Sequence, residues 1–139
     1  MIYLYKIICF LLTFLFVSCA SNRHVEKQEV LNLDFIELTT PFEIIILDYN
    51  PAGCSCGVRS CASNTIGKTI IDNDTIRVLS LCNNDTTYQL GERVKVIPTE
   101  KPNFHVLIAQ YWLNEDKKPY IPEIQKNTQK TIYGKLIKL

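Results

Sequence analysis

The sequence predicts an all-β domain with a single core. After residue 40, most of the chain consists of short runs rich in Val, Ile, Thr and aromatic residues, which favour strands. Clusters of Asn, Asp, Gly and Pro separate these runs, as expected of turns. No segment repeats its apolar residues at helical spacing, so we expect no helix. About six short strands over roughly 100 residues are typical of a sandwich or a small barrel.

The first predicted strands lie on either side of a cysteine-rich loop. Leu31–Phe35 alternates apolar and polar residues, which indicates an extended lead-in. The β-branched run Phe42–Leu47 follows Pro41 and ends at a turn signal, so we expect a buried strand there. The loop over 50–62 then leads to a strand at Thr65–Ile71.

The next strand is expected to complete a β-hairpin. The turn signal Asp72–Asp74 separates Thr65–Ile71 from Thr75–Cys82. A turn centred on Asn73 would place Cys82 opposite Asn64. Alternation along the second strand predicts one face with Ile76, Val78 and Ser80 and another with Arg77, Leu79 and Leu81.

Three further segments complete the predicted sheet. Arg93–Ile97 alternates as a strand between Gly91 and Pro98. Phe104–Leu113 fits either a strand or a short helix, and its aromatic and β-branched residues favour a strand. Residues 114–122 contain two prolines and are expected to form a loop. Thr131–Ile137 is the closing strand.

This order of strands loosely resembles small OB-like barrels, including those of small bacterial lipoproteins of unknown function. The resemblance covers about Phe42 to Leu139 and rests on pattern. It implies a small OB-like β-barrel. An immunoglobulin-like sandwich is the alternative, because the segment between the third and fourth barrel strands has no candidate for the usual OB helix.

The N-terminus has the features of a bacterial export signal. Lys6 is the lone charge before Ile7–Val17, an almost wholly apolar run of signal-peptide length. The run ends in Phe16-Val17-Ser18-Cys19 and is followed by Ala20 and Ser21. This ending resembles the lipobox of bacterial lipoproteins, in which an apolar residue and then a small residue precede the cysteine.

The resemblance implies that Cys19 becomes residue one and carries diacylglycerol on sulfur and a fatty acid on nitrogen. Residues 1–18 are then the signal peptide, 19–40 a lipidated tether and lead-in, and 41–139 a single β domain. Ala20 in place of Asp after the anchor favours the outer membrane. An ordinary secreted protein and an uncleaved transmembrane helix, which needs about 20 apolar residues, are the alternatives.

The cysteine count agrees with this interpretation. Of the six cysteines, Cys9 leaves with the signal and Cys19 becomes the anchor. The four that remain in an oxidising compartment predict disulfides: Cys54, Cys56, Cys61 and Cys82. Cys54 and Cys56 are too close to bridge each other without strain. Either one of them reaches Cys61 and the other Cys82, or Cys61 pairs with Cys82 and a strained bond remains.

The same four cysteines permit two other chemistries. A four-thiolate zinc site usually has two close pairs, whereas Cys82 stands alone. A redox or Cu(I) site is the second alternative, because Cys54 and Cys56 present two soft ligands. Met1 is the only methionine, so no methionine cluster supports copper. The prediction is therefore structural disulfides with no metal and no cofactor.

Charge and motifs predict neither catalysis nor binding of nucleic acid. The chain has 15 basic and 14 acidic side chains, and Lys6 lies in the signal, so the mature part is formally neutral. Nucleic acid usually requires a basic patch, which the sequence lacks. No catalytic motif is present. His105 lies in an apolar run and is expected to be a core or half-buried histidine.

Two weaker surface signals remain. Tyr111, Trp112 and Tyr120 could form an aromatic ligand patch, although aromatic residues in a β core are commoner. Asp74-Thr75-Ile76 and Asp85-Thr86-Thr87 resemble the O-glycosylation sites of exported Bacteroidota proteins.

The sequence as a whole predicts a non-enzymatic envelope lipoprotein. Its membrane contact is the lipid on Cys19, and its β domain binds an envelope protein or glycan. The alternative is a metal- or redox-handling lipoprotein that uses Cys54, Cys56, Cys61 and Cys82.

Overall fold

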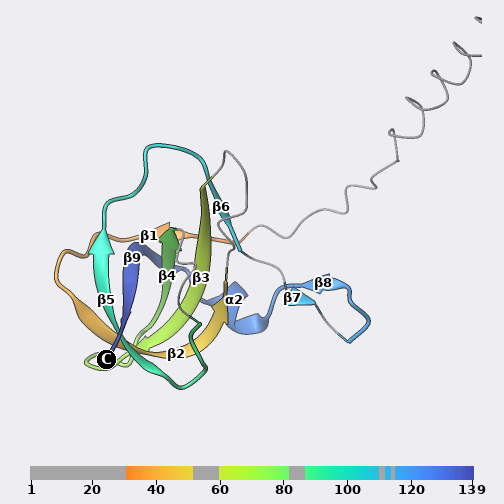
Figure 1. Ribbon diagram of the computed structural model, residues 1–139, viewed down its shortest axis with the longest axis horizontal. Helices are drawn as coiled ribbons and strands as arrows, with labels where there is room; N and C mark the ends of the chain where they lie inside the picture. The colour runs from red at the N-terminus through yellow and green to blue at the C-terminus, as the bar shows by residue number, and fades with distance from the viewer. Residues whose placement is uncertain (1–30, 52–59, 82–86, 110–111, 114) are drawn as a thin grey trace, which may run out of the picture.

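The computed structural model describes residues 31–51, 60–81, 87–109, 112–113 and 115–139. These ranges are mostly strand, with one short helix (Figure 1). The elements are β1 (Asp34–Phe35), β2 (Phe42–Asn50), β3 (Ser60–Thr69), β4 (Thr75–Leu81), β5 (Arg93–Thr99), β6 (Val106–Ile108), β7 (Trp112–Leu113), β8 (Pro119–Tyr120), α2 (Glu123–Asn127) and β9 (Lys130–Lys138).

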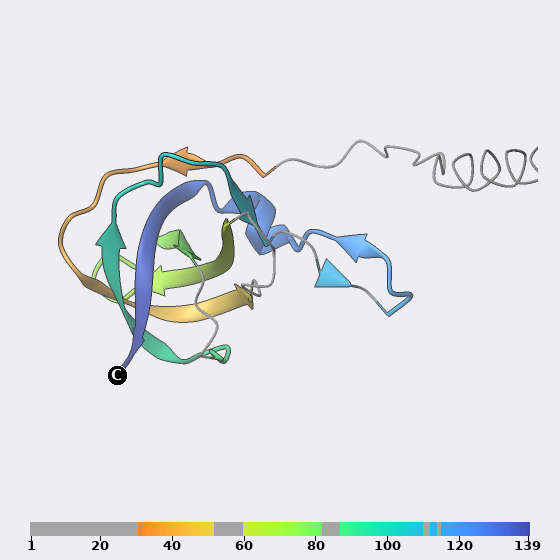
Figure 2. The same ribbon diagram turned by 45° about the horizontal axis from the view of Figure 1, so that its top comes forward.

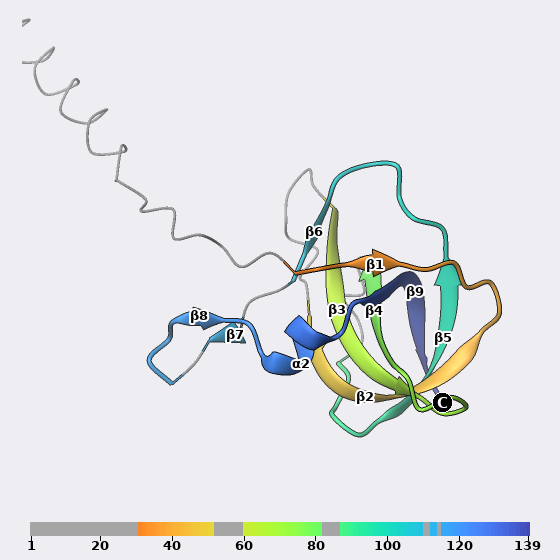
Figure 3. The same ribbon diagram turned by 180° about the vertical axis from the view of Figure 1, so that it is seen from behind.

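Five of the strands close into a barrel. The pairing runs β2, β3, β4, β9, β5 and back to β2. The β4–β9 pair is parallel, and the other four pairs are antiparallel. Figures 1 and 3 show the closed barrel from two sides. The predicted all-β, OB-like barrel is confirmed, and the sandwich alternative is wrong because the sheet closes on itself.

The barrel interior is filled mostly by aliphatic side chains from alternating strand positions, together with Tyr88. The main core cluster is Ile44, Ile46, Ile76, Val78, Tyr88, Val94, Val96, Ile132 and Leu136. Gly67 of β3 faces this core, where a Cβ atom would lie 2.8 and 2.9 Å from Cβ and Cγ1 of Ile44. The glycine therefore leaves room for the neighbouring strand's isoleucine.

The predicted hairpin forms, but its register differs from the expected one. Asn64 pairs with Leu79 and not with Cys82. The turn spans Thr69 to Asp74, and Asn73 adopts the left-handed conformation at φ 55°. Because Thr69 accepts the Asn73 amide and donates its own to Asp74, the centre of the turn lies before Asn73. The two predicted faces of β4 are confirmed.

The segment between β5 and β9 departs most from the expectation. Phe104–Leu113 is not one strand, because it contains β6 and β7 separately. Part of the expected loop at 114–122 is β8, and α2 follows it. A five-residue helix is too short for helical periodicity to show in the sequence.

This segment, residues 100–129, is called the insertion below. Its β6 pairs in parallel with the start of β3 and extends the sheet. Its β7 and β8 form a small antiparallel hairpin, which projects from the barrel beside α2 (Figure 2). The insertion thus adds an outer layer to one side of the barrel.

Candidate functional site

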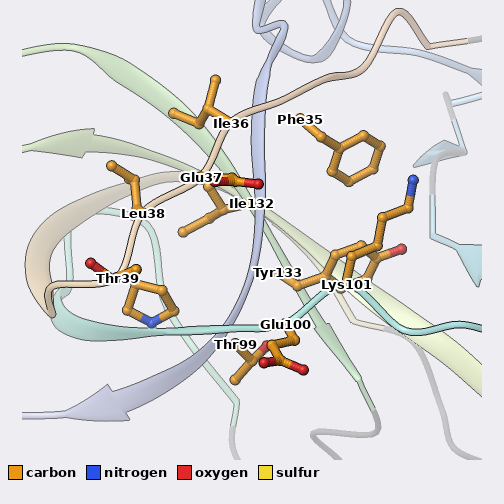
Figure 4. Close-up of a pocket in the computed structure, with 11 residues that line it drawn as sticks. Phe35, Ile36, Glu37, Leu38, Thr39, Thr99, Glu100, Lys101, Ile132 and Tyr133 are labelled. Atoms are coloured by element: carbon orange, nitrogen blue, oxygen red, sulfur yellow. The ribbon is translucent and has the colours of Figure 1, made fainter.

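A groove of about 510 Å³ lies where three segments of the barrel meet. One wall is the strap, residues 35–39, which leads from β1 toward β2. The opposite wall is residues 98–101, at the end of β5. Ile132 and Tyr133 of β9 also line the groove. In Figure 4 the strap residues Ile36, Glu37 and Leu38 lie above Thr99 and Glu100, and Ile132 and Tyr133 lie between them.

The groove exists because two strands share one edge of β9. Thr131 pairs with Phe35 of β1 and, on its other side, with Arg77 of β4. Two residues later, Tyr133 pairs with Thr99 of β5. β1 is parallel and β5 antiparallel to β9, so the C-terminal ends of β1 and β5 run toward each other along the same edge of β9. Both chains must therefore turn away from that edge. The space between the departing chains is the groove.

An aromatic pair forms one end of the groove. The rings of Phe35 and Tyr133 are stacked, with centroids 5.6 Å apart and planes 8° apart. The Lys101 ammonium lies 4.5 Å from the centroid of the Phe35 ring. Burial raises the pKa of Tyr133, so its phenol stays neutral at physiological pH. Phe35 is 38% exposed, so the pair presents part of an aromatic surface to solvent.

Charged and apolar side chains line the rest of the groove. Glu37 comes from the strap and Glu100 from the opposite wall, and both are exposed. The apolar lining is Ile36, Leu38, Pro98 and Ile132. Two carboxylates against the single ammonium of Lys101 make the lining acidic. The arrangement suits a ligand with an apolar body and a positive or hydroxylated group.

A second polar cluster lies on the outer face of the barrel, beneath α2. Arg77 of β4 is fully buried, and its Nη2 donates to the main-chain oxygens of Gln125 at 2.6 Å and Thr128 at 3.0 Å. The Gln125 side chain accepts from Asn64 at 2.9 Å and donates to Asp48 at 2.5 Å. Four elements far apart in the sequence therefore meet at one buried glutamine.

A β-bulge brings Asp48 to this cluster. The register of β2 against β3 shifts between Ile46 and Asp48, so Ile46 faces the core while Asp48 pairs with Ile66 on the outer face. Without the extra residue, Leu47, strict alternation would turn Asp48 inward.

The guanidinium of Arg77 acts as a clamp on α2. Its two acceptors lie at the C-terminal end of the helix, where positive charge is favourable. Burial lowers the pKa of Arg77 to about 10, and the Asp48 carboxylate opposes the shift, so the group is protonated at neutral pH. Its Nε and Nη1 have no hydrogen-bond partner among the described residues. Burial of the Arg77 guanidinium therefore costs free energy, and its bonds to the carbonyl oxygens of Gln125 and Thr128 are what offset that cost.

The insertion covers the face that OB barrels commonly use for ligands. That face belongs to the second and third barrel strands, here β3 and β4. Its outward side chains Asn64, Arg77 and Leu79 are all fully buried. Asn64 and Arg77 lie against α2, and Leu79 belongs to a cluster packed by Val106 and Ile108 of β6. The strap groove, in contrast, is open.

Most of the sequence-predicted site residues lie outside the described ranges. These are Cys19, Cys54, Cys56, Cys82, Thr86 and Tyr111. Tyr120 is 44% exposed, and Thr75 is exposed at the start of β4. His105 is exposed and not half-buried, because Phe104–Leu113 is not a continuous strand of the core.

Of the four cysteines predicted to form disulfides, the structure describes Cys61. It is 4% exposed, and its sulfur is in a disulfide. The partner cysteine lies outside the described residues, so the pairing of the four cysteines stays a prediction. Ala62 and Leu81, which adjoin Cys61 and Cys82 in the sequence, are direct cross-strand partners.

No pattern in the sequence predicted the groove. Its aromatic pair joins Phe35 of the lead-in to Tyr133 of the closing strand, almost a whole domain apart in the chain. The single available signal was the alternation at Leu31–Phe35, which indicated a strand and not a binding wall.

Comparison of the chain with protein-family models, curated proteins and solved structures gives no match. Across the described ranges, no three His, Cys, Asp or Glu residues gather closely enough to hold a metal. No helix among the same residues has the length and apolar character needed to span a bilayer.

We predict that Arg77→Met destabilises the protein by about 3 kcal/mol, because the buried oxygens of Gln125 and Thr128 lose their donor. Urea unfolding measures the loss. Lys68→Met, on the exposed face of neighbouring β3, is the control and should change stability by less than about 0.5 kcal/mol. Equal stability of the two variants would contradict the clamp.

We also predict that the protein purified from an oxidising compartment contains no titratable thiol under denaturation and that Cys61 is linked to Cys82. Directly opposed positions of an antiparallel pair have Cα atoms about 4.5–5.5 Å apart, within the range that a disulfide spans. Non-reducing peptide mapping identifies the link, and reduction should lower the melting temperature by several degrees. Four free thiols in oxidised material would instead favour the metal or redox alternative.

Proposed function

We propose that this chain is a lipid-anchored binding protein of a bacterial cell envelope, without enzymatic activity. The lipobox-like stretch ending at Cys19 supports the anchor. The open strap groove is the observation that carries the binding role, because it combines an exposed aromatic ring, apolar walls and charged groups. Disulfides among Cys54, Cys56, Cys61 and Cys82 stabilise the barrel in the oxidising compartment.

The position of the groove in the chain fits this proposal. The strap begins at Phe35, the last residue of β1, and so lies within the predicted tether and lead-in of residues 19–40. From Cys19 to Asp34 the chain can extend by about 50 Å at most. An anchored barrel can therefore present the groove to an envelope component at that range from the bilayer. The outer membrane is the proposed location.

The acidic lining bears on the choice of partner. Glu37 and Glu100 repel polyanions, so the groove does not suit nucleic acid. An envelope protein or glycan is the proposed partner. The alternative function, metal or redox handling by the four cysteines, rests on residues of which three lie outside the described ranges.

We predict that a fatty-acid probe labels the protein in the cells that express it and that Cys19→Ala abolishes the label. The reason is that the modified cysteine is the only proposed membrane-binding group. The variant should remain unprocessed or appear in the soluble fraction. Cys9→Ala is the matched control and should label normally. Absence of label on the unaltered protein would remove the anchor from the proposal.

Occupancy of the groove can be measured by hydroxyl-radical footprinting. We predict that Phe35 and Leu38 are oxidised less in isolated envelopes than in the detergent-purified protein, because a partner covers them. Leu90 and Ile71, which are 69% and 85% exposed outside the groove, should react equally in both samples. Equal oxidation of the groove residues in both samples would refute the binding role.

A further inference from the structure

The groove already holds a cation against its aromatic ring. Lys101 is exposed and lines the groove, and its ammonium lies 4.5 Å from the Phe35 centroid. Ring faces attract cations through their quadrupole, and the stack on Tyr133 holds the ring in a fixed orientation. The wall of the groove thus contains a formed cation-binding surface, occupied by a side chain of the protein itself.

Two carboxylates extend this surface. Glu37 and Glu100 line opposite walls, one on the strap and one after β5 (Figure 4). Neither takes part in the ion pairs found among the described residues, which join Arg93 to Glu43, Lys130 to Asp74 and Lys138 to Glu92. The acidic groups of the groove therefore remain available to an incoming positive charge.

The rest of the lining is apolar and favours a ligand that carries apolar groups beside its positive charge. Ile36, Leu38, Pro98 and Ile132 supply apolar contact beside the charges. Leu38 is 41% exposed, so part of this apolar surface is open to solvent. A bare amine would leave these contacts unused, whereas a cation on an aliphatic chain with apolar neighbours would cover them.

We propose that the strap groove binds a basic side chain of a partner polypeptide, a lysine flanked by aliphatic residues. This inference rests on the proposed binding function and names the chemistry of its partner. The incoming ammonium takes the position of Lys101 over Phe35, and Glu37 and Glu100 on the two walls of the groove attract it. The aliphatic neighbours cover Leu38 and Ile132.

Removal of the Lys101 charge distinguishes a cationic ligand from an anionic one, because the affinity should change in opposite directions. A ligand cation must displace the Lys101 ammonium, so removing that charge should strengthen binding of a cation. If the true ligand were an anion, such as an acidic glycan, Lys101 would be its main attraction and the same change would weaken binding.

The experiment uses the full chain, extracted in detergent from expressing cells, and two fluorescent peptides. One is acetyl-Ala-Leu-Lys-Leu-Ala-amide, and the other has Glu in place of Lys. Fluorescence anisotropy measures the affinity of each. We expect the lysine peptide to bind and the glutamate peptide to bind at least tenfold more weakly. Equal binding of the two peptides, or preference for glutamate, would overturn the proposal.

Four variants then locate the interaction. Lys101→Met should tighten binding of the lysine peptide about threefold, and Glu37→Gln and Glu100→Gln should each weaken it about threefold. Lys68→Met, on the exposed face of β3, is the control and should have no effect. Weaker binding by Lys101→Met, or no effect of either glutamate variant, would contradict the proposed position.

The two proposals fail in different ways. If footprinting finds Phe35 and Leu38 covered in envelopes while the lysine peptide does not bind, the groove is a binding site for another chemistry. If Phe35 and Leu38 are oxidised equally in envelopes and in the purified protein, the proposed binding function is wrong, whether or not the lysine peptide binds.

Discussion

Burial of the Arg77 guanidinium under α2 is the interaction on which the outer layer of this structure depends. The charge lies on the outward face of β4, a position that water would normally cover. It is compensated by two main-chain oxygens of the insertion and by the nearby Asp48 carboxylate. A helix of five residues is not stable alone in water. The barrel therefore holds the helix in place, and the helix shields the charge.

This constraint determines which surface stays available. With α2 and β6 packed over β3 and β4, the face most used by OB barrels is closed. The open recess lies instead where β1 and β5 leave the edge of β9. It is built from the strap, which leads from β1 toward β2. In the proposed function, binding and anchoring thus involve adjacent stretches of the same chain.

The barrel could be predicted from the sequence because its signals are local. The β-branched run at Phe42–Leu47 and the turn at Asp72–Asp74 are enough to locate β2 and the β3–β4 hairpin. Alternation also placed Arg77 on the same face as Leu79. What it could not show was that this face is buried, because the covering residue Gln125 lies 48 positions later.

The register and the groove escaped prediction for related reasons. A shift of three positions in the hairpin depends on how Thr69 and Asp74 close the turn, and several closures suit the same residues. The bulge at Leu47 interrupts an apolar run without any Gly or Pro to mark it. Phe35, Glu100 and Tyr133 are brought together only by the pairing along β9, which no single stretch of sequence encodes.

Hydrogen exchange of the purified protein tests most directly whether the barrel holds the insertion over its outer face. The amides of Gln125, Lys126 and Thr128 donate within or at the end of α2. We expect these amides to exchange slowly, with protection approaching that of β4 and β9, because the contact of Arg77 with α2 must open before they reach water. Exchange as fast as that of an isolated short helix would contradict this expectation, since Arg77 would then not hold α2 on the barrel.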